Sequence, residues 1–265
     1  MQNHLPRITK STYSALDLSI AEVTLLEVRF HRLIKDQLIR FLTTAAIKQQ
    51  KTVVGHVNIH AMNLAYELPW YKKFLNEAQL VYCDGIGVIV AARLLGHSVT
   101  LKHRQTCPDW IEALALSCQD HQLSLFLLAS EPHVLTKAVD KLHSKTPRLR
   151  LAGHHGYFCK TGPENESIIN RINAFNPDIL CVGFGMPLQE QWIKDNKDRL
   201  KAQVFLPMGG CLDYYTNRVY RGPRWLTDHG LEWVIRTATQ PKRLWRRYLV
   251  GNPLFFWRLA KHLYS

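Results

Sequence analysis

Short, almost continuously apolar segments alternate with longer amphipathic segments along the chain, and this alternation limits the folds that the sequence can adopt. Apolar runs of four to six residues are typical of parallel strands covered on both faces, and they lie at 52–57, 79–83, 123–128, 149–153, 178–183 and 203–208. The intervening segments predict helices over roughly 60–76, 86–96, 108–120, 132–144, 164–175 and 187–199. We therefore predict an α/β fold, with a Rossmann-like parallel sheet flanked by helices.

The two ends of the chain differ from this alternating middle. Residues 1–50 have apolar side chains such as Leu38 and Leu42 at helical spacing, which predicts a mostly helical segment. From Glu232 onward the chain is rich in Lys and Arg, and Glu232 is the only acid. The predicted organisation is a helical N-terminal segment over 1–50, an α/β domain over 51–220 and a helical, basic and aromatic C-terminal appendage over 221–265.

The charge of the chain points to an anionic partner. Lys and Arg number 34 against 21 Asp and Glu, which gives a formal net charge of +13. A surplus of this size is typical of proteins that bind nucleic acid, anionic lipid or phosphorylated substrates. No stretch approaches the roughly 18 apolar residues of a membrane-spanning helix, so a soluble or surface-bound protein is expected.

The appendage has three interpretations. On a helix, Leu244, Trp245, Tyr248 and Leu249 would form one aromatic face, with basic residues in the intervening positions. Such a helix can lie in a membrane interface, bind nucleic acid through arginines and stacking aromatics, or pack its aromatic face on the main domain. The density of Trp and Phe favours the membrane.

Asp84 is the sharpest candidate among the residues that follow the predicted strands, where open α/β sheets bind ligands. It ends the second strand in the sequence Asp84-Gly85-Ile86-Gly87. The glycines allow close approach of a ligand to the backbone, and the carboxylate can act as a general base toward an attacking hydroxyl. The alternative is a structural Asp that caps the following helix.

Other strand ends also carry polar residues. Asn58 follows the first strand and can hold a sugar hydroxyl or a phosphate oxygen, or close a turn; His56 and His60 flank it as acid–base candidates. The fifth strand leads into GFGMPLQEQW, where Gly185 and Gln189 favour a ligand loop and where Gln189 and Glu190 are expected to face the mouth of the cleft. Further candidates for substrate binding are Thr106 and Asp213, and Arg104, which can pair with a phosphate or be solvated.

Taken together, the ordered blocks HVNIHAMNLA, YCDGIGV, RQTCPDW, GHHGYF, PDILCVGFGMPLQEQWI and MGGCLDYYTNRVYRGPRWLTDHGLEWVIRTATQPKRLWRRY closely resemble the WecG/TagA/CpsF glycosyltransferase family. The resemblance runs from about residue 50 to 250. GFGMPLQEQW and GLEWVIR with QPKRLWRRY are its most specific parts.

This resemblance implies an inverting transferase at the cytoplasmic face of the bacterial inner membrane. Such enzymes move an N-acetylmannosamine-type sugar, or its uronic acid, from a UDP donor to polyprenyl-diphosphate-linked N-acetylglucosamine. The partners implied are the UDP-sugar, the undecaprenyl-diphosphate-linked acceptor and an anionic membrane surface, and a homo-oligomer is compatible with this picture. No cofactor is expected, and no metal site is predicted, because there is no HExxH motif and no DxD pair at a strand end.

The resemblance also assigns residues. It implies that Asp84 is the base, that Asn58 and Gln189 bind substrate, and that appendage arginines grip the lipid diphosphate; these map to Arg236, Arg243 and Arg246, with Arg247 adjacent. The chain departs from the family pattern at His56, Cys107, Ala129, Ser130 and in Arg221-Gly222-Pro223. These departures leave the reaction type standing and the exact donor sugar open.

Three functions therefore remain distinct at this stage. They are the membrane-associated glycosyltransferase, including one that uses another UDP-hexose in capsule or exopolysaccharide assembly; a basic nucleic-acid-binding protein; and a soluble nucleotide-dependent enzyme with an unrelated substrate. The nucleic-acid hypothesis lacks a recognisable binding motif and has its charge concentrated at one end. No nucleic-acid partner is expected.

Overall fold

The computed structural model describes residues 10–13 and 18–264, without the side chains of residues 10–13, 18, 19, 224, 228 and 243. The chain divides into two compact units. Unit 1 comprises residues 1–35, 56–106 and 222–265, and unit 2 comprises residues 36–55 and 107–221. The predicted division of the chain into domains at residues 50 and 220 stays a prediction.

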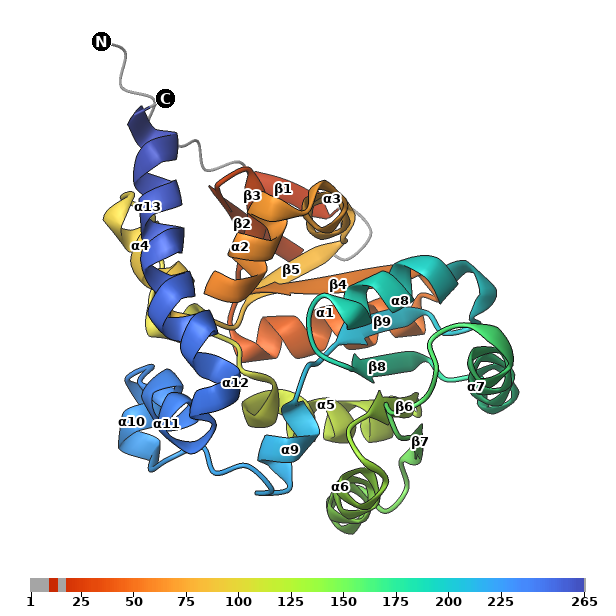
Figure 1. Ribbon diagram of the computed structural model, residues 1–265. Helices are drawn as coiled ribbons and strands as arrows, with labels where there is room; N and C mark the ends of the chain where they lie inside the picture. The colour runs from red at the N-terminus through yellow and green to blue at the C-terminus, as the bar shows by residue number, and fades with distance from the viewer. Residues whose placement is uncertain (1–9, 14–17, 265) are drawn as a thin grey trace. The chain divides into compact units, whose positions relative to one another are not determined.

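Unit 2 is built on parallel strands. The first residues of β4 (Thr52–Val57) pair with β9 (Val204–Pro207), followed by β8 (Ile179–Gly183), β6 (Ser124–Ala129) and β7 (Arg150–His154) (Figure 1). All residues of β6 and β9 are buried, as expected for strands with both faces covered.

Helices connect the strands of unit 2. They are α1 (Lys35–Ile47), α5 (Cys107–Asp120), α6 (Pro132–Lys145), α7 (Gly162–Phe175), α8 (Leu188–Asn196) with the 3₁₀ turn η2 (Lys197–Arg199), and α9 (Cys211–Tyr215). The predicted α/β fold, with a parallel sheet flanked by helices, is confirmed.

Unit 1 combines three antiparallel strands, one parallel strand and the C-terminal helices of the chain. Strands β1 (Lys10–Tyr13), β2 (Leu18–Leu25) and β3 (Val28–Arg32) are antiparallel, and β5 (Leu80–Cys83) runs parallel to β3. Its helices are α2 (Ile59–Glu67), α3 (Pro69–Glu77), α4 (Ile86–Leu94), η1 (Leu101–His103), α10 (Arg224–Asp228), α11 (Glu232–Thr239), α12 (Pro241–Trp245), the π-helical turn η3 (Arg246–Val250) and α13 (Gly251–Tyr264).

The prediction of a mostly helical segment over residues 1–50 was wrong for 10–13 and 18–32, which form β1, β2, β3 and the turn between β2 and β3; the helix there is α1. Residues 1–9 and 14–17 lie outside the described residues. The turn between β2 and β3 is made by Leu26 and Glu27, both with positive φ. Neither residue type is a usual signal for a tight hairpin, which Asn-Gly or Asp-Gly gives. The single helix predicted over 60–76 is also two helices, because Pro69 starts α3.

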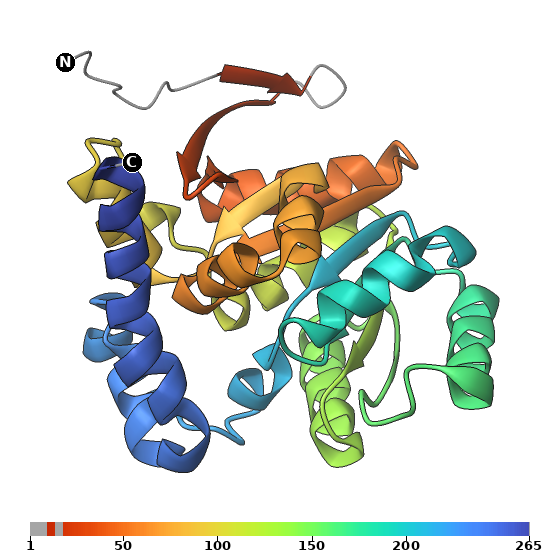
Figure 2. The same cartoon turned by 45° about the horizontal axis from the view of Figure 1, so that its top comes forward.

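A buried arginine fastens α13 to α2. Arg258, 8% exposed, donates to the side-chain oxygen of Asn63 at 3.0 Å and to Glu67 at 2.6 Å, and its guanidinium lies 4.4 Å from the ring centroid of Tyr66. Asn63 in turn donates to the carbonyl of Gly251 at 2.8 Å, at the start of α13. Two views show α13 alongside α4 (Figures 1 and 2). The position of the C-terminal helix within unit 1 is therefore set by specific polar contacts.

Within residues 10–13 and 18–264, none of the helices is both long and apolar enough to cross a membrane.

Candidate functional site

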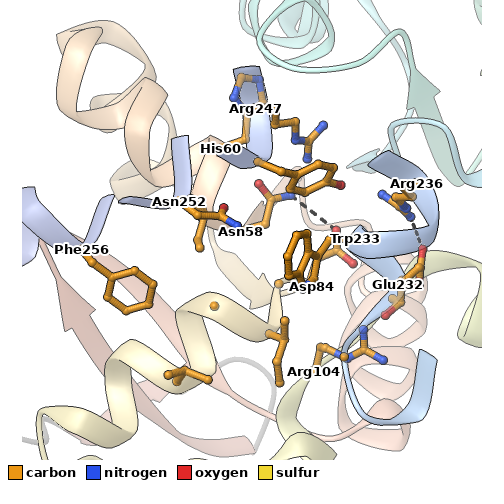
Figure 3. Close-up of a pocket in the computed structure, with 18 residues that line it drawn as sticks. Asn58, His60, Asp84, Arg104, Glu232, Trp233, Arg236, Arg247, Asn252 and Phe256 are labelled. Atoms are coloured by element: carbon orange, nitrogen blue, oxygen red, sulfur yellow. Dashed lines mark hydrogen bonds and ion pairs between the residues drawn. The ribbon is translucent and has the colours of Figure 1, made fainter. Parts of the chain in front are cut away.

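A cavity of about 320 Å³ lies within unit 1, at the carboxyl end of β5. Its walls come from the residues after β4 and β5, from α4, and from the C-terminal helices α11, η3 and α13 (Figure 3). The lining residues are Asn58, Ile59, His60, Asp84, Gly85, Ile86, Gly87, Val90, Arg104, Thr106, Gly230, Glu232, Trp233, Arg236, Arg247, Tyr248, Asn252 and Phe256. Residues that follow β4 and β5 and residues of the C-terminal helices therefore line one cavity.

Asp84 lies at the centre of this cavity and is half-buried. Its backbone N–H donates to the carbonyl of Val57 at 2.9 Å, which fixes the end of β5 beside the end of β4. Helix α4 has Gly85 as its N-cap residue and no side-chain capping bond. Asp84 therefore does not cap α4, and its carboxylate faces the cavity.

Asn58 serves both a structural role and the site. Its side-chain oxygen accepts a hydrogen bond from the N–H of Ala61 at 3.1 Å and so caps α2. Its amide nitrogen faces the Asp84 carboxylate at 3.5 Å (Figure 3). The bond from Ala61 occupies the side-chain oxygen of Asn58, so the amide N–H groups are the part that faces the cavity. These N–H groups orient the Asp84 carboxylate and offer a hydrogen-bond donor to a ligand.

Gly85 is required by the close approach of Asn58. A Cβ atom at position 85 would lie 2.6 Å from the Cβ and 2.8 Å from the Cα of Asn58. We expect Gly85→Ala to push the Asn58 backbone away from Asp84, to destabilise the protein by about 1–3 kcal/mol and to reduce activity, as measured by urea unfolding and turnover. Gly87→Ala is the matched comparison, because its Cβ would meet only the side chain of Ile59. Equal stability and activity of both variants would contradict this role of Gly85.

Arginines bring positive charge into the cavity. Arg104, Arg236 and Arg247 line it against the carboxylates of Asp84 and Glu232, a surplus of one positive charge. Arg104 is held by its bond to the carbonyl of Thr227 at 2.7 Å, and Arg236 donates to Glu232 one turn earlier on α11.

A hydroxyl in the same wall is available to a ligand. Thr106 is 6% exposed and lines the cavity, and its Oγ1 has no hydrogen-bond partner among the residues that the structure describes. A buried hydroxyl without a partner carries a desolvation cost, which a bound polar ligand would remove. Thr106 therefore belongs with the arginines as a ligand-binding candidate.

The two histidines near the site differ in position. His60 lines the cavity, and burial together with the nearby Arg247 lowers its pKa to about 4. His56 lies behind the wall, stacked on Tyr82 with ring centroids 5.4 Å apart, and burial lowers its pKa as well. Both imidazoles are therefore neutral at physiological pH, where they can exchange hydrogen bonds but add no charge.

The appendage arginines are placed unevenly. Arg236 and Arg247 line the cavity, whereas Arg246 is exposed and lies over the Trp245 ring, 5.3 Å from its centroid. The Arg243 side chain lies outside the described part of the structure. The single aromatic face predicted for this segment was also wrong, because Trp245 and Leu249 are exposed while Leu244 is buried. Neighbouring positions on a helix point about 100° apart, so Leu244 of α12 can be buried while Trp245 is exposed.

The remaining predicted residues, Gly185, Gln189 and Asp213, lie in unit 2 and are not among the residues that line this cavity. The side-chain oxygen of Gln189 accepts from the N–H of Gly185 at 3.2 Å and of Gly209 at 3.0 Å, and its amide donates to Glu190 at 2.7 Å. Gln189 and Glu190 are 0% and 1% exposed, so the expectation that they face the mouth of a cleft was wrong. Gln189 joins the loops that follow β8 and β9, and a role for it in binding substrate stays a prediction.

Asp213 is also held within unit 2. One carboxylate oxygen accepts from Arg218 at 3.0 Å and the other from Ser130 at 3.2 Å. It lies on α9, the helix that follows β9 in the chain. Asp213 was predicted to bind substrate because it follows a strand, and this role stays a prediction.

The buried carboxyl group of Glu190 is expected to make the free energy of unfolding depend on pH. Burial raises its pKa to about 8 from 4.5, and its Oε2 has no hydrogen-bond partner within the described residues. Between these pH values the folded protein holds a proton that the unfolded chain has released, so stability falls as pH rises from about 4.5 to 8. We expect Glu190→Gln, which still accepts from Gln189, to flatten this fall in urea titrations across that range. The exposed Asp198→Asn is the control, and a wild-type slope in Glu190→Gln would contradict burial as the cause.

Several cavity residues were not among the sequence-predicted site residues: Glu232, Trp233, Tyr248, Asn252 and Phe256. Trp233 and Arg236 stand three residues apart on α11, so helical spacing could have paired them. Asn252 and Phe256 follow the π turn, where helical spacing counted from the preceding helix no longer holds. Among the described residues, no group of three or more His, Cys, Asp or Glu side chains is arranged to hold a metal ion.

Comparison with known proteins identifies the family of the chain. The model of the glycosyl transferase WecG/TagA/CpsF family matches residues 23–265. Two relatives from Staphylococcus aureus, of strains NCTC 8325 / PS 47 and MRSA252, are each 29% identical over 244 residues, which cover 91% of this chain and 93% of theirs. Both are named N-acetylglucosaminyldiphosphoundecaprenol N-acetyl-beta-D-mannosaminyltransferase. The matched stretch contains every residue of the cavity, and the chain therefore belongs to the WecG/TagA/CpsF family and is a glycosyltransferase.

Proposed function

We propose that this protein transfers an N-acetylmannosamine-type sugar from a UDP donor to N-acetylglucosamine on a polyprenyl diphosphate, with inversion at the anomeric carbon. The observation that carries the proposal is the half-buried Asp84 carboxylate, presented to a cavity whose walls also hold Arg104, Arg236 and Arg247. The names of the staphylococcal relatives supply the acceptor and the sugar.

The proposed reaction is a single displacement. Asp84 accepts the proton of an acceptor hydroxyl while that oxygen forms a bond to the anomeric carbon. The bond from this carbon to the diphosphate oxygen breaks, and UDP leaves with the electron pair. Asn58 holds the carboxylate toward the hydroxyl, and cationic groups favour the diphosphates of the substrates. One displacement without a covalent intermediate inverts the configuration.

A donor panel tests the proposal. The protein is incubated with lipid-linked N-acetylglucosamine and, separately, with UDP-linked N-acetylmannosamine, N-acetylmannosaminuronic acid, N-acetylglucosamine and glucose, and products are read by mass. We expect a product from N-acetylmannosamine or its uronic acid. Transfer of another UDP-hexose alone would replace the proposed donor by the alternative one, and no transfer from any donor would overturn the proposal.

We further propose that the protein acts at the cytoplasmic face of the bacterial inner membrane, bound at its surface. The exposed Trp245, Leu249 and Trp257 lie among cations of η3 and α13, a combination suited to an anionic bilayer. Each basic residue near such a surface contributes about 1 kcal/mol.

Vesicle flotation tests this membrane binding. We expect the protein to float with phosphatidylglycerol vesicles, and the double variant Trp245→Ala/Leu249→Asn to float less. Leu116→Asn, which changes an exposed leucine of α5, should float like wild type. Salt-sensitive binding to RNA or DNA without vesicle binding would instead favour a nucleic-acid partner.

A further inference from the structure

The cavity of unit 1 has two chemically different ends. Within the described part of the chain, five charged residues line it: Asp84, Arg104, Glu232, Arg236 and Arg247. Phe256 lies on the other side of Asp84 from Arg236 (Figure 3). Helix α4 contributes the apolar residues Ile86, Gly87 and Val90 to the same cavity. One end of the cavity is therefore ionic and the other apolar.

The apolar end continues onto the surface along one face of α4. Ile86, Val90 and Leu94 stand four residues apart and share a helix face. Ile86 and Val90 line the cavity, yet Val90 is 41% exposed and Leu94 is 72% exposed. Both views place α13, which carries Phe256, beside α4 (Figures 1 and 2). An apolar strip thus runs from inside the cavity to the outside of the protein.

A ligand that fits this strip must be ionic at one end and a hydrocarbon at the other. Charged and apolar residues line different parts of one continuous cavity, which favours a single molecule that spans both parts. A second copy of the chain would cover the exposed Leu94 but would not account for the ionic end. A polyprenyl diphosphate has the required order, because its charged group adjoins a linear chain of apolar isoprene units.

We infer that the α4 strip, defined as Ile86, Val90 and Leu94 with Phe256 of α13 opposite, binds the isoprene units nearest the diphosphate of the acceptor. The inference rests on the proposed function for the identity of the ligand. The strip removes this part of the lipid from water while the head group stays at the ionic end. The enzyme thereby recognises the carrier itself, in addition to the sugar.

Equilibrium binding in the absence of membranes tests this directly. The probes are methyl diphosphate and geranyl diphosphate, which share the head group and differ in hydrocarbon, both kept below micelle-forming concentrations. We expect the full-length wild type to bind geranyl diphosphate at least tenfold more tightly, and Leu94→Asn and Val90→Asn to reduce this preference severalfold. Leu116→Asn, on α5, should keep it.

The outcomes separate the inference from the proposed function. Equal affinity of the wild type for the two probes, or an unchanged preference in both strip variants, overturns the inference even if sugar transfer is observed. A preference that the strip variants lose, together with no transfer in the donor panel, upholds the strip as an isoprenoid site and overturns the proposed reaction. Thermal melting of the exposed-site variant Leu94→Asn, expected to equal wild type, excludes unfolding as the cause.

Discussion

Asp84→Asn is expected to lower the rate of sugar transfer at least a hundredfold while the protein stays folded. A positioned general base contributes about 10²–10⁴ to a rate, and an amide cannot accept the acceptor's proton. The size and shape of the side chain are unchanged, and Asn58 still finds an oxygen to donate to. Turnover under saturating donor and acceptor measures the loss, and thermal melting checks the fold.

Asp120→Asn is the matched control for this variant. Asp120 is an exposed carboxylate at the end of α5 and does not line the cavity, so its replacement should leave turnover unchanged. If Asp84→Asn kept more than a tenth of the wild-type rate, another group would have to be the base. A lowered melting temperature in Asp84→Asn alone would mean that the carboxylate acts in folding.

Arg258→Ala is expected to destabilise unit 1 and to weaken acceptor use. The substitution removes bonds to Asn63 and Glu67 and leaves the oxygen of the buried Asn63 without its partner, at a cost of about 2–3 kcal/mol. Because α13 carries Phe256 into the cavity, we also expect the acceptor KM to rise about tenfold with a smaller change in the donor KM. Thermal melting and steady-state kinetics measure both effects.

Two comparisons make this experiment specific. Arg258→Lys keeps the charge but loses the paired geometry of the guanidinium, so it should fall between wild type and Arg258→Ala. Lys261→Ala removes an exposed cation from the same helix and should melt like wild type. A rise in donor KM equal to that in acceptor KM would show that Arg258 does not act through the acceptor side of the cavity.

The centre of the site was predictable because its residues follow strands. Once the apolar runs at 52–57 and 79–83 were recognised as parallel strands, the residues after them had to lie at one edge. The structure places Asn58 and Asp84 there, within 3.5 Å. It also settles a question that spacing left open, since α4 begins without a side-chain cap from Asp84.

Other parts of the site depended on contacts that residue types do not encode. Arg104 and Arg236 are far apart in sequence and line the same cavity because the C-terminal helices belong to the same unit as β5. Gln189 has a polar side chain, but its partners are backbone N–H groups of two loops, and no sequence pattern distinguishes such burial from exposure. Arg246 and Arg247 are neighbours on η3, and only Arg247 lines the cavity, a difference that residue type alone does not reveal.

The most direct test of the account is the anomeric configuration of the product, read by NMR after transfer from an α-linked UDP-N-acetylmannosamine to lipid-linked N-acetylglucosamine. A single carboxylate that deprotonates the acceptor, with no covalent sugar–enzyme intermediate, predicts a β-linked product that forms with wild type and is lost with Asp84→Asn. An α-linked product would contradict this mechanism, because attack of the deprotonated acceptor oxygen on the face opposite the leaving UDP inverts the anomeric carbon.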